Sequence, residues 1–112
     1  MDLRQFQDRL QAFADARNWN QFHSPKNLAM ALSVEVAELV EIFQWLTEAQ
    51  SRDLSASQRA ALADEIADVQ IYLLRLADVT GVDIEAAVEQ KLIKNALKYP
   101  VVPHADQPET SA

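Results

Sequence analysis

Only one glycine, Gly81, occurs among the 112 residues of this chain, together with only four prolines. A fold built from many β-strands needs tight turns, and these two residue types supply much of the backbone geometry in such turns. Alanine and leucine, which are strong helix formers, recur along the chain instead. The sequence therefore predicts an all-α fold, and a chain of this length fits a single domain.

The charge of the chain limits the classes of partner that it can bind. The formal net charge is −7, whereas a general nucleic-acid-binding protein would show a basic stripe. A small polyanion is not excluded, because a bound metal ion can invert the local charge. There is no cysteine, no signal-peptide pattern at the start, and no uncharged apolar stretch near the ~18 residues of a membrane span. We therefore expect a cytoplasmic protein that binds neither nucleic acid nor membranes.

Capping residues and the spacing of apolar residues predict four helices. Ser24 is a good N-cap ahead of Pro25, and Ser55 with Gln58 matches a capping box. The expected architecture resembles a four-helix bundle with antiparallel neighbours. The helices are expected from about residue 2 to about 17, from 25 to about 46, from the Ser55 cap to Gly81, and from the Asp83 cap to Tyr99-Pro100.

The segments outside these helices have different expectations. Residues 47–54 are polar and are predicted to form a connection between the second and third helices. Residues 101–112 contain two more prolines and no periodicity, so we expect a mobile tail after a domain of residues 1–100.

In the first helix, the predicted apolar stripe consists of Leu3, Phe6, Leu10 and Phe13.

Three glutamates in the second predicted helix have no basic residue nearby in the sequence. Glu35, Glu38 and Glu41 lie among apolar residues, and no lysine or arginine occurs between Lys26 and Arg52. A solvated helix face usually mixes charges of both signs and gains from pairs four residues apart. Part of this acidic edge is therefore expected near a helix–helix interface.

A matching acidic pair, Glu65 and Asp68, occurs in the third predicted helix with the same spacing of three as Glu35 and Glu38. If the two helices pack antiparallel, the pairs can face each other. Four converging carboxylates cannot all stay ionised without a cation, and oxygen ligands favour a hard ion such as Mg²⁺ or Mn²⁺. The alternative is a solvated acidic face, since either pair alone recurs in helices by chance.

A di-iron bundle is a less favoured chemistry for these acids. Such sites need a Glu-x-x-His motif on two helices. The histidines of this chain are His23, in a predicted loop, and His104, in the predicted tail.

Aromatic and basic residues outside the acidic pairs suggest a nucleotide ligand. Aromatic rings with polar tips can stack on a base, although single rings also fix loops to a core. Lysine ammonium groups attract phosphates, although cations near a helix C-terminus also favour the helix dipole. The aromatic candidates are Trp19, Phe22, His23, Trp45 and Tyr72, and the candidates on one face of the fourth helix are Lys91, Asn95 and Lys98.

Taken together, these motifs resemble the MazG-like all-α nucleoside triphosphate pyrophosphohydrolases, and within them the dCTP pyrophosphatase branch. The resemblance covers roughly residues 12 to 100, and nearly all spacings match without shifts. It is carried by Glu35-x-x-Glu38, Glu65-x-x-Asp68, Trp19-x-x-Phe22-His23-x-Pro25-x-Asn27-Leu28, Phe43-Gln44-Trp45, Asp68-Val69-x-Ile71-Tyr72-Leu73 and Lys91-x3-Asn95-x3-Tyr99-Pro100.

The resemblance implies an enzyme that hydrolyses a nucleoside triphosphate between its α and β phosphates. It also implies a homodimer or homotetramer whose sites are shared between subunits, and a role in removing unwanted deoxynucleotides. We expect Glu38 to act as the general base. The implied Mg²⁺ ligands are Glu35, Glu38, Glu65 and Asp68, and the implied substrate-binding residues are Trp19, His23, Trp45, Tyr72, Lys91 and Asn95.

Two departures and two alternatives accompany this interpretation. The chain has Ser33 and Ala37 where relatives often have glycine, and Leu10 where animal members have a histidine near the nucleotide. The base preference therefore stays open, and a related pyrophosphohydrolase acting on dUTP or phosphoribosyl-ATP is one alternative. The other alternative is a non-enzymatic helical interaction module, because the third helix is apolar beyond a single stripe.

Overall fold

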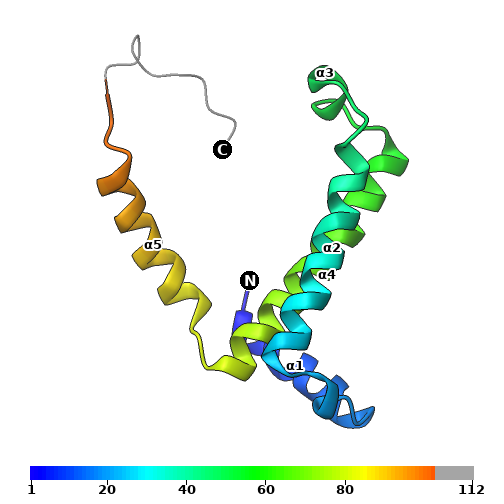
Figure 1. Ribbon diagram of the computed structural model, residues 1–112, viewed down its shortest axis with the longest axis vertical. Coiled ribbons are helices and arrows are strands. Elements are labelled where there is room, and N and C mark those ends of the chain that lie inside the picture. Colours follow the sequence, from blue (N-terminus) through cyan, green and yellow to red (C-terminus); the bar gives the residue numbers. More distant parts are fainter. Residues whose placement is uncertain (103–112) are drawn as a thin grey trace. The chain divides into compact units, whose positions relative to one another are not determined.

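The computed structural model describes residues 1–102, and every regular element in that range is helical. The all-α prediction is confirmed. The chain divides into two units, the first comprising residues 1–82 and the second beginning at Asp83, and each is described by itself. Most of the predicted mobile tail lies outside the described residues. The elements are α1 (Leu3–Ala16), the 3₁₀ turn η1 (Asn20–Phe22), α2 (Pro25–Phe43), α3 (Glu48–Ser51), α4 (Ala56–Thr80) and α5 (Ile84–Lys98) (Figure 1).

Local capping interactions set the start and the end of the predicted helices. The Ser24 hydroxyl accepts a hydrogen bond from the Asn27 amide, which satisfies one free donor at the start of α2. The capping box at Ser55 forms with both of its hydrogen bonds. Gly81 ends α4 with a φ of 75°, a left-handed conformation that glycine adopts without strain.

The connection between α2 and α4 differs from its prediction, because residues 47–54 contain the short helix α3. Thr47 and Gln50 form a second capping box, with N···O distances of 3.2 Å and 3.0 Å. The prediction that α2 reaches Leu46 is also wrong. The helix ends at Phe43, and the Leu46 amide then donates to the Phe43 carbonyl in a turn.

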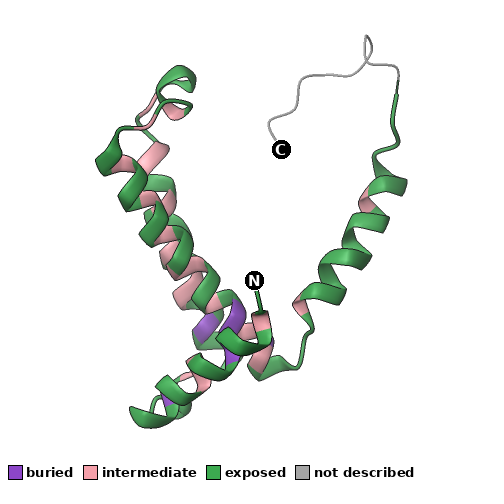
Figure 2. Ribbon diagram, turned by 180° about the vertical axis from the view of Figure 1, so that it is seen from behind, coloured by how far each residue is buried: buried purple, intermediate pink, exposed green. Residues whose placement is uncertain are grey.

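The first unit is built on an antiparallel pair of helices, α2 and α4, which lie side by side along most of their length (Figure 1). Helix α1 packs against α4 near the end where α2 begins and α4 ends. Burial is concentrated at that end (Figure 2), and the buried residues come from α1, α2 and α4. The buried apolar residues there are Ala14, Leu28, Leu74 and Ala77.

The buried face of α1 shares the half-buried Leu3 and Leu10 with the predicted stripe but not its two phenylalanines. Phe6 and Phe13 are 39% and 47% exposed, whereas Gln7 and Ala14 are buried. These smaller side chains allow α1 to approach α4 closely, and the Gln7 amide donates to the Leu74 carbonyl at 3.1 Å. Packing at the crossing therefore selected small or hydrogen-bonded residues over the largest apolar ones.

The second unit contains α5, which begins after the Asp83 cap. None of its residues is buried, and its apolar side chains Leu92, Ile93 and Leu97 are mostly exposed. Of the described helices, none combines the length and apolar character that crossing a membrane requires.

We expect Leu28→Ala to lower the free energy of unfolding by about 2–5 kcal/mol, because this side chain is only 2% exposed and truncation leaves a cavity. Urea unfolding followed by circular dichroism at fixed protein concentration measures the change. Val101→Ala is the control, because Val101 is 95% exposed and its substitution should shift stability by less than about 0.5 kcal/mol. Equal effects in the two variants would contradict the assigned core.

Candidate metal centre

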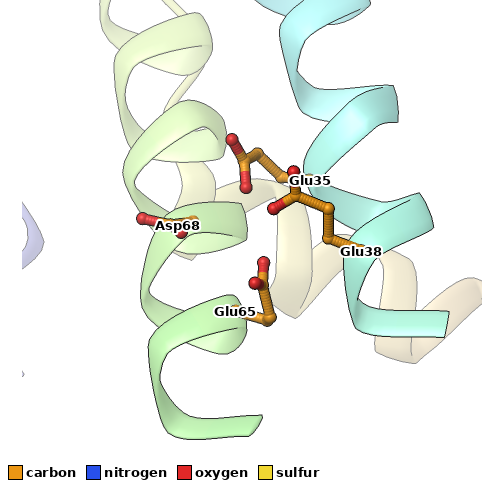
Figure 3. Close-up of side chains that lie close together, drawn as sticks. All are labelled: Glu35, Glu38, Glu65 and Asp68. Atoms are coloured by element: carbon orange, nitrogen blue, oxygen red, sulfur yellow. The ribbon is translucent and has the colours of Figure 1, made fainter. Parts of the chain in front are cut away.

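Four carboxylates converge between the paired helices of the first unit. Glu35 and Glu38 extend from α2 towards α4, and Glu65 extends from α4 into the same space (Figure 3). One oxygen from each of these residues and one from Asp68 all lie within 4.8 Å of one another. The antiparallel packing places two pairs, each with a spacing of three residues, at the same level of the hairpin.

Two oxygens of this cluster are buried without a hydrogen-bond partner. Among the described residues, Glu35 Oε2 and Glu65 Oε2 have no donor. The ion pairs found in the described part of the chain involve other acidic groups. A buried carboxylate oxygen without a donor loses its hydration with no compensation. The folded chain therefore presents negative charge that needs a positive partner.

The proton affinities of the cluster reflect the same crowding. Burial raises the pKa of Glu35 above its usual value, and the neighbouring charges of Glu38, Asp68 and Glu65 raise it further. The pKa of Glu65 is raised mainly by burial and then by Glu38 and Asp68. Both shifts mean that full ionisation of the four groups is unfavourable without a cation.

The donor set fits a hard divalent cation. All four donors are carboxylate oxygens, two of the oxygens are unpaired, and their spacing allows a single ion to contact several residues. A cation at this position would satisfy the unpaired oxygens and remove the mutual repulsion.

The aromatic candidates near the start of α2 form a separate group in the same unit. The Trp19 ring meets Phe13 edge-on at a centroid distance of 5.5 Å and lies tilted against His23 at 6.2 Å. Trp19 is 42% exposed, and the Arg17 guanidinium carbon lies 5.9 Å from the centroid of its ring. His23 is half-buried, and its Nδ1 accepts a hydrogen bond from Arg75 Nε at 3.0 Å.

The remaining predicted substrate residues lie on other elements. Trp45 is 86% exposed in the turn after α2, and Tyr72 is half-buried on α4, one turn beyond Asp68. Lys91 and Asn95 lie four residues apart on α5, in the second unit. Of the predicted site residues, the structure therefore brings the four carboxylates together and places Trp19 against His23.

Sequence reasoning missed Arg75, which is buried on α4 and contacts the predicted binding residue His23. The available signal was a single charged residue in the apolar run from Ile71 to Leu76. A lone charge in such a run has a specific partner if its side chain is buried. Gln11 and Asn20, which also bond Arg75, carry no comparable signal.

We expect Glu35→Gln to raise the midpoint of thermal unfolding by a few degrees in EDTA at pH 7.5. The pKa of Glu35 is higher in the folded state than in the unfolded state. The contribution of this residue to the free energy of unfolding is therefore complete below its unfolded pKa near 4.5 and is lost as the pH rises through its folded pKa. The neutral amide avoids this loss, so the difference should vanish near pH 4. Scanning calorimetry at both pH values measures it.

Glu41→Gln is the matched control, because Glu41 is exposed on the same helix and lies outside the cluster. It should leave the midpoint nearly unchanged in EDTA. A lower midpoint for Glu35→Gln at pH 7.5 would show that the four carboxylates do not repel one another.

Curated proteins with related sequences have a named activity. The chain is 47% identical over 91 residues to dCTP pyrophosphatase 1 of Rattus norvegicus, a match that covers 80% of this chain and 54% of the rat protein. It is 47% identical over 90 residues to dCTP pyrophosphatase 1 of Homo sapiens, covering 79% and 53%. The chain thus spans about half the length of the curated relatives it matches.

A solved structure and a family match agree with these relatives. The crystal structure of a pyrophosphatase from Archaeoglobus fulgidus aligns with a TM-score of 0.84 and 42% sequence identity, covering 90% of this chain and 94% of that one. The MazG-like family matches residues 30–111, which include all four converging carboxylates. The chain therefore belongs to the MazG-like family.

Proposed function

We propose that this chain is a nucleoside triphosphate pyrophosphohydrolase that converts its substrate to the monophosphate and pyrophosphate. The single observation that carries the proposal is the convergence of Glu35, Glu38, Glu65 and Asp68, with two buried oxygens lacking partners. The similarity to dCTP pyrophosphatases and to a pyrophosphatase of known structure supports the reaction class. Water adds to the α-phosphorus, and the bond from that phosphorus to the bridging oxygen of pyrophosphate breaks.

Mg²⁺ is the proposed cofactor, with Mn²⁺ as a substitute, and the four carboxylates would hold it. Oxygen donors and a phosphate substrate favour these two ions over softer metals. When bound, such an ion neutralises phosphate charge and orients the phosphates for in-line attack. The carboxylates themselves fix the ligand positions on two rigid helices.

Glu38 is the proposed general base. It is the exposed member of the cluster, so a water molecule can reach it more readily than it can reach Glu35 or Glu65. Its carboxylate extends into the space between α2 and α4 (Figure 3). There it can accept the proton that the attacking water loses as the new bond to phosphorus forms.

The substrate-binding residues are proposed from the resemblance together with their placement. Trp19, His23 and Trp45 would contact the base, since aromatic rings stack on nucleobases. The packing of Trp19, which is partly exposed, against His23 supports this role. For Tyr72, Lys91 and Asn95, the resemblance alone supports contact with the phosphates or the sugar.

The proposed substrate is dCTP or a similar deoxynucleotide, with dUTP and phosphoribosyl-ATP as the alternatives. The proposed role is removal of unwanted nucleotides from the cytoplasmic pool. A pyrophosphate assay over all four dNTPs, dUTP and phosphoribosyl-ATP ranks these substrates. We expect dCTP to give the highest rate with Mg²⁺ and expect EDTA to abolish the reaction.

Within that assay, Glu38→Gln and Asp68→Asn should each reduce turnover by at least roughly 100-fold, because loss of a general base or a ligand typically costs this much. Circular dichroism should show unchanged helix content. Glu41→Gln is the control and should retain full turnover. Full activity of Glu38→Gln would reject the assignment of the base, and no release from any nucleotide by the wild type would reject the enzymatic proposal.

We further propose that the chain forms a homodimer or homotetramer through its exposed apolar residues. The first unit is small and leaves large apolar side chains in water on both of its paired helices. A second copy presents the same exposed apolar residues, which suits a two-fold symmetric contact. The exposed residues are Met30, Val34, Val36 and Val40 of α2 and Ile66, Ile71 and Leu73 of α4.

Light scattering after size exclusion should give at least twice the chain mass of 12.6 kDa. Met30→Glu should shift the assembly towards smaller species, because a buried charge at an apolar contact is unfavourable. Arg52→Glu, at an exposed position of the connection between α2 and α4, should leave the mass unchanged. A monomeric wild type at tens of micromolar would refute this assembly. An assembled but inactive protein would favour the interaction module.

A further inference from the structure

A guanidinium group is buried where α1, η1 and α4 meet. Arg75 is 4% exposed and donates hydrogen bonds to three neutral acceptors. Its Nη1 donates to Gln11 Oε1, its Nη2 to Asn20 Oδ1 at 2.7 Å, and its Nε to His23 Nδ1 at 3.0 Å. The nearest acidic oxygen paired with it, Asp78 Oδ2, lies at 4.0 Å. A buried charge is tolerated only when it is satisfied in this way.

Asp15 fixes the orientations of the Gln11 and Asn20 side-chain amides. Its carboxylate accepts from Gln11 Nε2 at 2.8 Å and also from Asn20 Nδ2. These two hydrogen bonds lower the pKa of Asp15, with a smaller contribution from the charge of Arg75. Because the amide nitrogens face Asp15, the amide oxygens face Arg75. The guanidinium is therefore held in one orientation by residues of α1, of η1 and of the short segment between η1 and α2.

The Arg75 contact determines which nitrogen of His23 carries the proton. A guanidinium only donates, so the Nδ1 that accepts from it has no proton, and a neutral ring carries its proton on Nε2. Burial lowers the pKa of His23, and the charge of Arg75 lowers it further, so the ring is neutral at pH 7. No hydrogen bond joins Nε2 to the residues that the structure describes.

We propose that Arg75 is a positioning residue for nucleotide recognition, which fixes His23 as a hydrogen-bond donor through its Nε2–H. This inference rests on the proposed function, in which His23 contacts the base. The ligand atom opposite Nε2 must then be an acceptor, such as a carbonyl oxygen or an unprotonated ring nitrogen. Trp19, tilted against the same imidazole at 6.2 Å, would supply the adjoining stacking surface.

The first experiment determines the tautomer in the wild-type protein, without any substitution. A long-range ¹H–¹⁵N spectrum at pH 7.5 assigns the proton to one ring nitrogen of His23. We expect Nε2 to carry it and Nδ1 to be unprotonated. A proton on Nδ1, or on both nitrogens, would overturn the proposal, whatever the enzyme assay gives.

The second experiment is a double-mutant cycle of Arg75→Met and His23→Ala, read as KM and kcat for dCTP. Each single variant should raise KM about tenfold, the loss expected for one hydrogen bond to the ligand, and change kcat by less than about threefold. In the His23→Ala background, Arg75→Met should raise KM no further, because Arg75 acts only through His23. An equal additional rise there would overturn the positioning role.

Two further variants separate positioning from folding. Arg75→Lys keeps one donor within reach of Nδ1, so it should recover part of the lost affinity. Arg9→Met removes an exposed guanidinium of α1 whose recorded contact is with Phe6, and it should leave KM unchanged. If Arg75→Met does not fold, the positioning role of Arg75 is tested by the His23 tautomer in the wild type and by the KM of Arg75→Lys. If the wild-type protein cleaves no nucleotide, the proposed function is rejected. The ¹H–¹⁵N spectrum still tests the Arg75–His23 contact in that case.

Discussion

The electrostatic repulsion between α2 and α4 is the constraint on which the proposed site depends. Apolar and small side chains bring the helices together, and this packing forces Glu35, Glu38, Glu65 and Asp68 into one space. Two carboxylate oxygens lose their water there without gaining a donor. A pair of helices selected for stability alone would carry mixed charges or apolar residues at this level. The hairpin thus retains local instability that a bound cation can relieve.

Two levels of the hairpin satisfy their charges differently. At the end next to α1, the acceptors of Gln11, Asn20 and His23 satisfy the buried charge of Arg75. At the level of the carboxylates, the charge is left without a protein partner. A satisfied network makes a region rigid, whereas an unsatisfied one leaves a place for a ligand. This contrast suits a site in which a fixed recognition group stands apart from an exchangeable ion.

Local signals in the sequence predicted most of the fold and the acidic part of the site. Helix starts at Ser24 and Ser55 and the end at Gly81 follow from capping chemistry, and the acidic spacing of three residues follows from helix geometry. Prediction failed where tertiary contacts determine which side chains are buried. Phe6 has greater apolar area than Gln7, yet Gln7 is buried because its amide reaches the Leu74 carbonyl. The roles of the site residues remain predictions.

The short helix α3 lies at the end of the hairpin away from α1 (Figure 1). Both acidic pairs occupy continuous helical segments that this connection joins but does not contain. Extra residues inserted there would lengthen an exposed loop at a small entropic cost and would leave the register of the paired helices intact. The connection is therefore a suitable position for a peptide tag or a spectroscopic label that leaves the positions of the four carboxylates unchanged.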